Sequence, residues 1–190
     1  MSKVLFIGDL HLDHGNVHKF RKEFVSDTHH HEHVMEKVLM TVNKKDLLYL
    51  MGDAAFSRSA IELLKEIKGR VILVKGNHDY PNSRYFLDVV EEVHGITKYK
   101  RAWLTHCPIH PAELWGKFNI HGHVHQNTIL TDTGEIDARY VNVCAENIDY
   151  TPISFADIVY WREQKMKGAD IHLQDHRHFG YRGVNINHTL

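Results

Sequence analysis

The 190-residue sequence has few cysteines and no long apolar run. Its two cysteines, Cys107 and Cys144, cannot form a disulfide framework, and neither lies in a CxxC pair typical of redox or zinc-ribbon sites. No apolar stretch approaches the roughly 20 residues that a transmembrane helix needs. The apolar segment from Met1 to Ile7 is shorter than the apolar part of a signal peptide, and no small-residue cleavage site follows it. We therefore expect a cytoplasmic protein.

The chain also lacks an excess of charge of either sign. Lys and Arg total 23, Asp and Glu total 24, and the formal net charge is −1. Nonspecific nucleic-acid binding uses a broad basic surface, which a nearly neutral chain does not indicate. A nucleic-acid partner is therefore possible but has no support in the composition. Histidine, in contrast, is abundant, with 18 residues. Because histidine is the commonest metal ligand, this count favours a metal site without locating it.

Three apolar runs of strand length end in the same way, with a glycine followed by an acidic or amide residue. The runs are VLFIG, LLYLMG and VILVKG, and the residues that follow them are Asp9, Asp53 and Asn77. Helical periodicity at 34–39 and 61–67 separates the runs, and a further helix is expected at 83–93. This alternation predicts an α/β fold whose strand ends carry their loops on one edge.

The second half of the chain is richer in predicted strands. Short strands at 102–105 and 118–120 each run into histidine, and TDTGE at 131–135 predicts a hairpin turn before a strand at 136–143. A helix is expected from Phe155 to Met166, with Ser154 as its N-cap. We predict one domain over residues 1–168 and a polar tail at 169–190 that is either loosely ordered or packed on the domain.

The polar residues at the strand ends form a candidate metal site. Asp9 and His11 lie two apart, so in an extended segment their side chains leave the same side of the backbone and can hold one ion. The carboxylate of Asp53 has two oxygens and can bridge two ions. The other candidates offer an amide oxygen or imidazole nitrogens, and they are Asn77, His106, His123 and His125. Nitrogen and oxygen ligands without thiolates suit manganese, our first expectation, or iron, zinc or nickel better than calcium.

Each of these residues alone has a simpler interpretation as a turn residue, a helix cap or a surface histidine. Five segments would have to place such a residue at a strand end by accident. The motifs DLH at 9–11, GD at 52–53, GNHD at 76–79, THCP at 105–108 and GHVH at 122–125 resemble, in order and spacing, the signature of the calcineurin-like metallophosphoesterases. The resemblance implies a four-layer sandwich of two β-sheets flanked by helices, with two metal ions at the strand ends.

The resemblance also implies a role for each motif. One ion would be held by Asp9, His11, Asp53 and His125, and the other by Asp53, Asn77, His106 and His123. His78 would stabilise developing charge or protonate the leaving oxygen, with Asp79 orienting its ring. His14 and Asn16 continue the first loop and are candidates for substrate contact.

The expected activity is hydrolysis of a phosphate ester, on a small phosphorylated molecule or an exposed phosphate of a larger one, with diesters favoured over monoesters. Two ions clamp the phosphoryl oxygens, and a metal-bridging hydroxide attacks in line. The alternative is a non-catalytic metal-binding scaffold for protein interaction, which would be expected to have lost ligands or His78. The cluster His29, His30, His31 and His33 is interpreted as a solvated helix face. The sequence predicts neither the oligomeric state nor the identity of the substrate.

Overall fold

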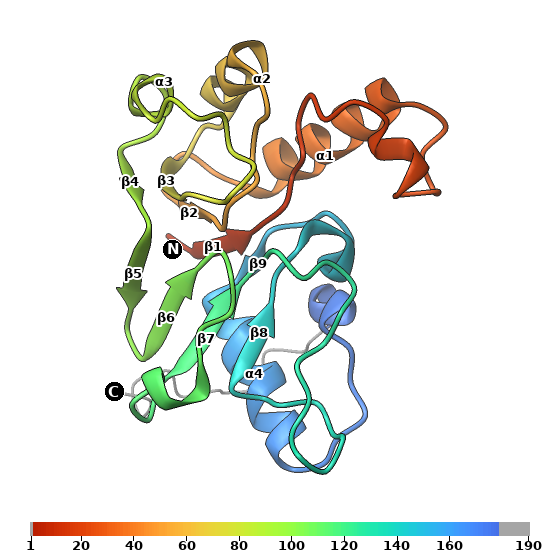
Figure 1. Cartoon of the computed structure of the whole chain (residues 1–190), viewed down its shortest axis with the longest axis vertical. Helices are drawn as coiled ribbons and strands as arrows, with labels where there is room; N and C mark the ends of the chain where they lie inside the picture. Colours follow the sequence, from red (N-terminus) through yellow and green to blue (C-terminus); the bar gives the residue numbers. More distant parts are fainter. Residues whose placement is uncertain (1, 179–190) are drawn as a thin grey trace.

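A computed structural model describes residues 2–178 of the chain, which form two β-sheets with helices around them (Figure 1). The strands are β1 (Val4–Ile7), β2 (Leu47–Leu50), β3 (Arg70–Val74), β4 (Glu92–His94), β5 (Ile96–Tyr99), β6 (Ala102–Thr105), β7 (Phe118–His121), β8 (Tyr140–Asn142) and β9 (Ile153–Ser154). The first sheet has the order β4-β3-β2-β1-β9 and the second the order β5-β6-β7-β8.

Both sheets are mixed. In the first, β1 to β4 are parallel and only β9 runs antiparallel, beside β1. In the second, β6, β7 and β8 are parallel and β5 is antiparallel to β6. Parallel neighbours need crossover connections, and helices supply them in the first sheet. The predicted α/β fold of two sheets flanked by helices is therefore confirmed.

The α-helices are α1 (Asp27–Thr41), α2 (Arg58–Leu63), α3 (Arg84–Leu87) and α4 (Phe155–Met166), and the short 3₁₀ segments are η1 (Val17–Lys19), η2 (Leu64–Glu66), η3 (Pro111–Glu113), η4 (Ala145–Ile148) and η5 (Leu173–His178). Helix α4 has the predicted bounds, and the Ser154 hydroxyl accepts a hydrogen bond from the Asp157 N–H, as a cap does. Within residues 2–178, no helix is both long enough and apolar enough to cross a membrane.

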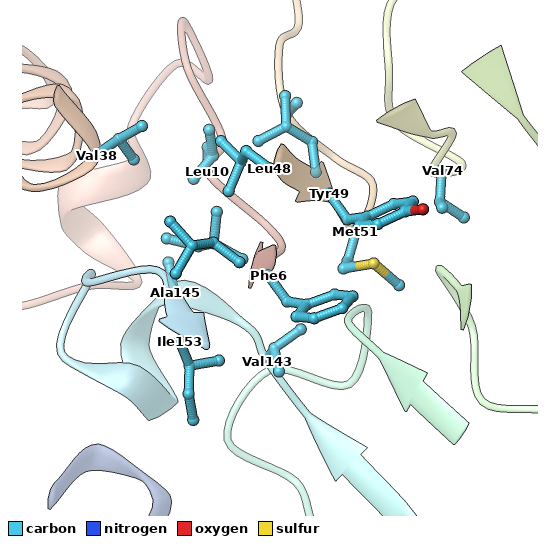
Figure 2. Packing of buried hydrophobic residues seen from close by; sticks show 14 of the residues in the cluster. Phe6, Leu10, Val38, Leu48, Tyr49, Met51, Val74, Val143, Ala145 and Ile153 are labelled. Carbon is cyan, nitrogen blue, oxygen red and sulfur yellow. The ribbon is translucent and has the colours of Figure 1, made fainter. Parts of the chain in front are cut away.

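Aromatic side chains join the two sheets. Phe6 of β1 stacks on Tyr49 of β2 with ring centroids 5.3 Å apart, and both rings meet Tyr99 of β5. Phe155, at the start of α4, packs edge-on against Tyr99 at 5.0 Å. The buried cluster continues on the other face of the first sheet to Val38 of α1 (Figure 2). Burial of this apolar surface holds the strands, and hence their ends, in place.

Two expectations about secondary structure were wrong in detail, and one strand was missed. The helix expected at 83–93 ends after one turn at Leu87, and the chain continues as β4, which pairs with β3. Strand β5 was not anticipated. Beyond the predicted turn at 131–135, only an isolated bridge between Leu130 and Ile136 forms before β8 begins at Tyr140. Tertiary pairing to a buried neighbour overrides the helical period of 83–93.

The expected C-terminal tail lies partly outside the described residues. Its described part contains η5, where Leu173 and His176 are buried. η5 contacts η4 and α4, so this portion is packed on the domain. Residues 179–190 lie outside the described part of the chain, and the boundary at residue 168 stays a prediction.

Candidate metal centre

The strand ends of both sheets meet at one edge. β1, β2 and β3 are parallel and in register, so the residues after them emerge side by side. The Asp9 N–H donates to the Gly52 carbonyl at 2.8 Å, and the Gly122 N–H donates to the His106 carbonyl at 2.9 Å. The Gly8 N–H donates to the Val143 carbonyl at 2.8 Å and ties the two sheets together beside the site. The carboxyl ends of five strands thus supply one cluster.

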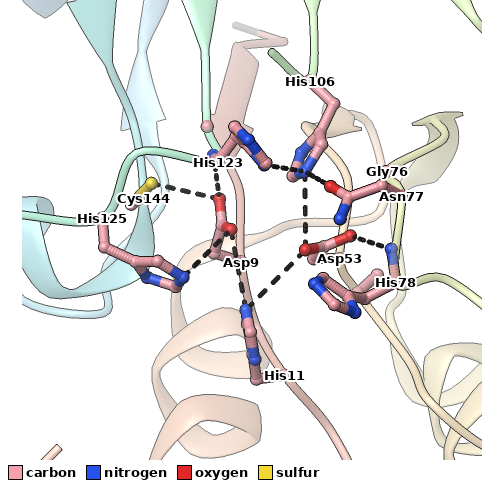
Figure 3. A network of polar contacts seen from close by, with 12 residues as sticks. Asp9, His11, Asp53, Gly76, Asn77, His78, His106, His123, His125 and Cys144 are labelled. Atoms are coloured by element: carbon pink, nitrogen blue, oxygen red, sulfur yellow. Dashed lines mark hydrogen bonds and ion pairs between the residues drawn. The ribbon is translucent and has the colours of Figure 1, made fainter. Parts of the chain in front are cut away.

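The structure brings the seven predicted metal ligands together (Figure 3). His11 Nε2 lies 3.6 Å from Asp9 Oδ1, and His125 Nε2 lies 4.0 Å from the same oxygen. On the other side, His106 Nε2 lies 3.0 Å from Asn77 Oδ1 and 3.2 Å from His123 Nδ1. Each half of the cluster therefore has the compactness of a site for one cation.

Asp53 lies between the two halves. Its Oδ2 is 4.0 Å from His11 Nε2 and 3.4 Å from His106 Nε2. Its Oδ1 accepts a hydrogen bond from the His78 N–H at 2.8 Å, which holds the carboxylate in one orientation. One carboxylate is thus shared by both groups of ligands, as a bridging residue must be.

Hydrogen bonds on the far side of two imidazoles determine which nitrogen faces the cluster. His106 Nδ1 lies 2.9 Å from the Met51 carbonyl oxygen, which can only accept, so Nδ1 carries a proton and donates it, and Nε2 is directed at the cluster. His125 Nδ1 lies 2.7 Å from Glu146 Oε1 and is oriented in the same manner. This arrangement is typical of metal-binding histidines.

Three glycines allow the loops to approach this closely. A Cβ on Gly76 would lie 2.1 Å from Asp53 Oδ1, and one on Gly122 would lie 2.2 Å from Asp9 Oδ2. A Cβ on Gly52 would meet the His106 ring at 2.2 Å, and Gly52 also has a φ of +89°. The glycine of each motif is therefore required by the packing of the cluster.

The backbone at the ligands differs from the extended form assumed for the first loop. Asp9 and His11 have φ values of 57° and 51°, in the left-handed region, so their convergence does not come from strand alternation. Asp53, His123 and His125 share this conformation, with φ of 49°, 71° and 52°. Left-handed non-glycine residues are uncommon and gather at functional sites.

The cluster has buried negative charge that nearby guanidinium or ammonium groups do not neutralise. Asp9 and Asp53 are almost fully buried, and their side chains contact imidazoles, backbone N–H groups and the Cys144 thiol. Asp9 Oδ1 and His11 Nε2 are buried without a hydrogen-bond partner. Burial alone would raise the pKa of Asp53, but the hydrogen bond to His106 lowers it. Because a buried carboxylate without a counter-charge is unfavourable, this donor set fits cations.

Sequence reasoning missed Glu146 and Arg21. Burial alone would raise the pKa of Glu146, but the hydrogen bond to His125 and the charge of Arg21 lower it to about 2. Arg21 Nη2 lies 2.5 Å from Glu146 Oε2 and also donates to the Asp9 carbonyl at 2.7 Å. The pair thus orients the His125 ring and holds the Asp9 backbone. Glu146 lies beyond β8 at the same edge, so the strand-end pattern was its only signal in the sequence.

His78 and Asp79 have different surroundings. His78 is exposed, and its ring stacks on Phe56 with centroids 5.7 Å apart and planes 10° apart. Asp79 is buried and accepts from four backbone N–H groups, those of Asp53, Ala54, Ala55 and Gly76. The expectation that Asp79 orients the His78 ring is therefore wrong in this structure: its oxygens instead join the GD and GNH loops.

The two candidate substrate residues also differ. His14 lines a cavity of about 470 Å³ beside His11 and His125. Burial lowers the pKa of His14, which favours a neutral ring. Asn16 is exposed, lies outside the residues that line this cavity and donates its backbone N–H to Asp27. The structure therefore places His14, but not Asn16, next to the cluster.

Comparison with known proteins identifies the family. Residues 20–145 match the calcineurin-like phosphoesterase superfamily domain, a span that contains every predicted metal ligand except Asp9 and His11. An uncharacterised protein of Methanocaldococcus jannaschii is 30% identical over 171 residues, which cover 84% of this chain and 90% of the relative. The gene 66 protein of Mycobacterium phage D29 is 33% identical over 90 residues, 45% of this chain and 44% of that protein.

A solved structure agrees. The crystal structure of a protein of unknown function from Aquifex aeolicus superimposes with a TM-score of 0.66 at 25% identity, covering 85% of this chain and all of that one. The family match spans well over half of the chain, and the motifs that it contains form the cluster described above. The chain belongs to the calcineurin-like phosphoesterase superfamily.

Proposed function

We propose that this protein hydrolyses phosphate esters at a pair of divalent metal ions bound by Asp9, His11, Asp53, Asn77, His106, His123 and His125. The observation that carries the proposal is the position of Asp53, whose Oδ2 lies within 4.0 Å of nitrogens from both halves of the cluster. Superfamily membership supports phosphoesterase chemistry and divalent metals, and manganese is the ion that we would test first.

Two cations bound there would supply an activated nucleophile at neutral pH and a clamp for the phosphoryl oxygens. The side chains of this protein then have separate tasks. Glu146 and the Met51 carbonyl hold the rings of His125 and His106 with Nε2 directed at the cluster. To exposed His78, whose backbone N–H is bonded to Asp53, we assign the donation of a proton or hydrogen bond to the oxygen that leaves phosphorus.

Asp79 acts as a positioning residue in this proposal. Its four hydrogen bonds hold the Asp53 and Gly76 backbones together, so the bridging carboxylate and the His78 loop keep their relative placement. Displacement of catalytic groups by about 1 Å can lower a rate by about two orders of magnitude. Asp79 would thus affect turnover without touching substrate.

A diester is the favoured substrate. The cavity beside His11 and His125 has a volume of about 470 Å³, more than a phosphate alone requires, so an ester group can lie next to the cluster. We therefore expect faster hydrolysis of bis(p-nitrophenyl) phosphate than of p-nitrophenyl phosphate.

The test is turnover of these two substrates by metal-stripped protein reconstituted with Mn²⁺. His78→Ala should lower kcat by roughly 10²- to 10⁴-fold while the protein still binds two ions. His172→Ala, at an exposed tail histidine whose contact is with Asp170, is the matched control and should have no effect. Binding of two ions without turnover by any divalent metal would refute catalysis and indicate a metal-binding scaffold for protein interaction.

A further inference from the structure

The cavity beside the candidate metal centre is lined by residues from several separate segments of the chain. Two of its lining side chains, His11 and His125, belong to the cluster, and the rest come from the first loop, from η1 and its C-terminal end, from the residues after His125 and from Glu146. Whatever is bonded to a phosphate at the metal centre would extend into this space. The chemistry of the walls therefore reports on that group, and this inference rests on the proposed function.

The cavity offers no unpaired charge. Its charged residues are Arg21 and Glu146, and their side chains are each 7% exposed and bonded to each other at 2.5 Å. The Arg21 guanidinium is also used by the Asp9 carbonyl and by His30 Nε2, which lies 2.7 Å from Nη1. No lysine lines the cavity in the described part of the chain. An uncharged group fits this space, whereas a second phosphate would find no cation.

An aromatic ring stands at the edge of the cavity. Phe20 is 77% exposed although it lines the cavity, and the ring of His14 meets it edge-on at 6.1 Å. Val17, buried below, adds apolar surface. An exposed phenyl ring beside a polar centre is a platform on which a planar group can stack.

Two carboxamides on the other wall are free to recognise such a group. Gln126 and Asn127 directly follow His125, both are exposed, and neither side chain makes a hydrogen bond within residues 2–178. The Asn127 backbone is held, because its N–H donates to Val124 and its carbonyl accepts from Asn142. A carboxamide presents a donor and an acceptor together, which is how Asn and Gln pair with the edge of a nucleobase.

We propose that this cavity binds the uncharged aromatic heterocycle of a nucleoside phosphate ester, with Phe20 as the stacking surface and Gln126 and Asn127 as the groups that read its edge. The substrate class is then a phosphodiester with at least one nucleoside. Specificity comes from stacking and hydrogen bonding in this space, and the phosphate is held by the metal centre.

Isothermal titration calorimetry of the Mn²⁺-loaded protein tests this proposal by comparing thymidine 5′-monophosphate with methyl phosphate, which share the phosphate but not the ring. The nucleotide should bind roughly ten- to a hundredfold more tightly. Phe20→Ala should abolish most of that preference and leave the affinity for methyl phosphate unchanged. Phe20→Trp should keep the preference, which shows that the ring is what matters.

Gln126→Ala provides a second, independent readout. This substitution should weaken the binding of thymidine 5′-monophosphate but not that of phenyl phosphate, whose ring stacks but has no hydrogen-bonding edge. Equal affinities for nucleotide and methyl phosphate, or a preference that survives Phe20→Ala, would overturn the inference. Turnover of bis(p-nitrophenyl) phosphate by the same preparation separates the two proposals: turnover without a nucleotide preference refutes this inference alone, and a preference without turnover refutes catalysis alone.

Discussion

Gly76 has no side chain, and the space that a Cβ would need is occupied by the Asp53 carboxylate and backbone nitrogen, 2.1 and 2.4 Å away. Gly76→Ala should lower the free energy of unfolding by about 1–3 kcal/mol, because the two loops must move apart. It should also weaken metal binding, because Asp53 moves. Urea unfolding and metal titration measure both effects. Gly95→Ala is the control, because a Cβ there meets no atom within 4 Å, and equal behaviour of the two variants would contradict the prediction.

Asp79→Asn removes one acceptor oxygen of the group that joins the GD and GNH loops. The amide would direct N–H donors at backbone N–H groups, so we expect a loss of about 1–3 kcal/mol in stability together with lower metal affinity. Thermal unfolding and calorimetric metal titration provide the measurements. His78→Ala should lower turnover but leave metal affinity intact. Normal metal affinity in Asp79→Asn would show that this residue does not position the centre.

His30 gives the stability a dependence on pH. It was expected on a solvated helix face, but it is fully buried and accepts a hydrogen bond from Arg21. Burial, with the charge of Arg21, lowers the pKa of His30 from 6.5 to about 3. Below about pH 6.5 the His30 imidazole therefore binds a proton in the unfolded chain but not in the native state. The free energy of unfolding falls as pH drops from about 6.5 towards 3, by at most about 1.4 kcal/mol per pH unit.

His30→Gln keeps an acceptor for Arg21 but does not titrate. Between pH 6.5 and 4, its free energy of unfolding should depend on pH less steeply than that of the wild type. The difference in slope corresponds to the uptake of up to one proton on unfolding. Urea denaturation at several pH values measures the slope. Identical slopes for the two proteins would mean that His30 is protonated alike in the folded and unfolded states.

Among the elements, α4 depends on its N-cap. The Ser154 hydroxyl accepts from the Asp157 N–H at 3.2 Å, and Ser154 also ends β9, the strand beside β1. Ser154→Ala should lower the free energy of unfolding by about 1 kcal/mol. Ser154→Thr retains the hydroxyl and should restore most of that loss. If both substitutions were equally destabilising, strand packing and not capping would be the cause.

The elements also show which parts of the fold a sequence can predict. β1, β2 and β3 were predictable because apolar runs ending in Gly8, Gly52 and Gly76 carry both a strand signal and a stop. The segment 83–93 was not, because its apolar period is helical while its last two residues, Glu92 and Val93, pair with β3. The candidate metal ligands were predicted from their motifs, but the cause of their convergence, a left-handed backbone, has no periodic signal.

The groups around the ligands were harder still to predict. Glu146 and Arg21 lie 125 positions apart in the chain, and only folding brings them together beside His125. Phe20 and Phe56 carry no motif, because an aromatic residue in a loop is indistinguishable in sequence from one that packs in the core. Sequence therefore gives the chemistry of the centre, whereas the structure gives its support and the cavity next to it.

For the whole molecule, removal of metal should loosen one edge and leave the fold intact. The two sheets are joined by the cluster of Phe6, Tyr49, Tyr99 and Phe155, none of which is a candidate metal ligand. The chelated protein should keep its far-ultraviolet circular dichroism. Mn²⁺ at about 100 times its Kd should raise the free energy of unfolding by about 2.7 kcal/mol for each of the two ions, and Tm by roughly 5–10 °C for each. Loss of the dichroism on chelation, or an unchanged Tm with metal, would contradict this.

The left-handed residues at the strand ends have a consequence for which ions can enter. Each such conformation costs about 1–3 kcal/mol and persists only where the surroundings over-determine it, so the loops bearing Asp9, Asp53 and His123 have little freedom to spread. Calcium needs six to eight oxygens at about 2.3–2.6 Å and would force them apart. Transition metals, with bonds of about 2.0–2.2 Å, would not. We therefore expect the backbone to select ions by radius, in addition to the preference set by the ligand atoms.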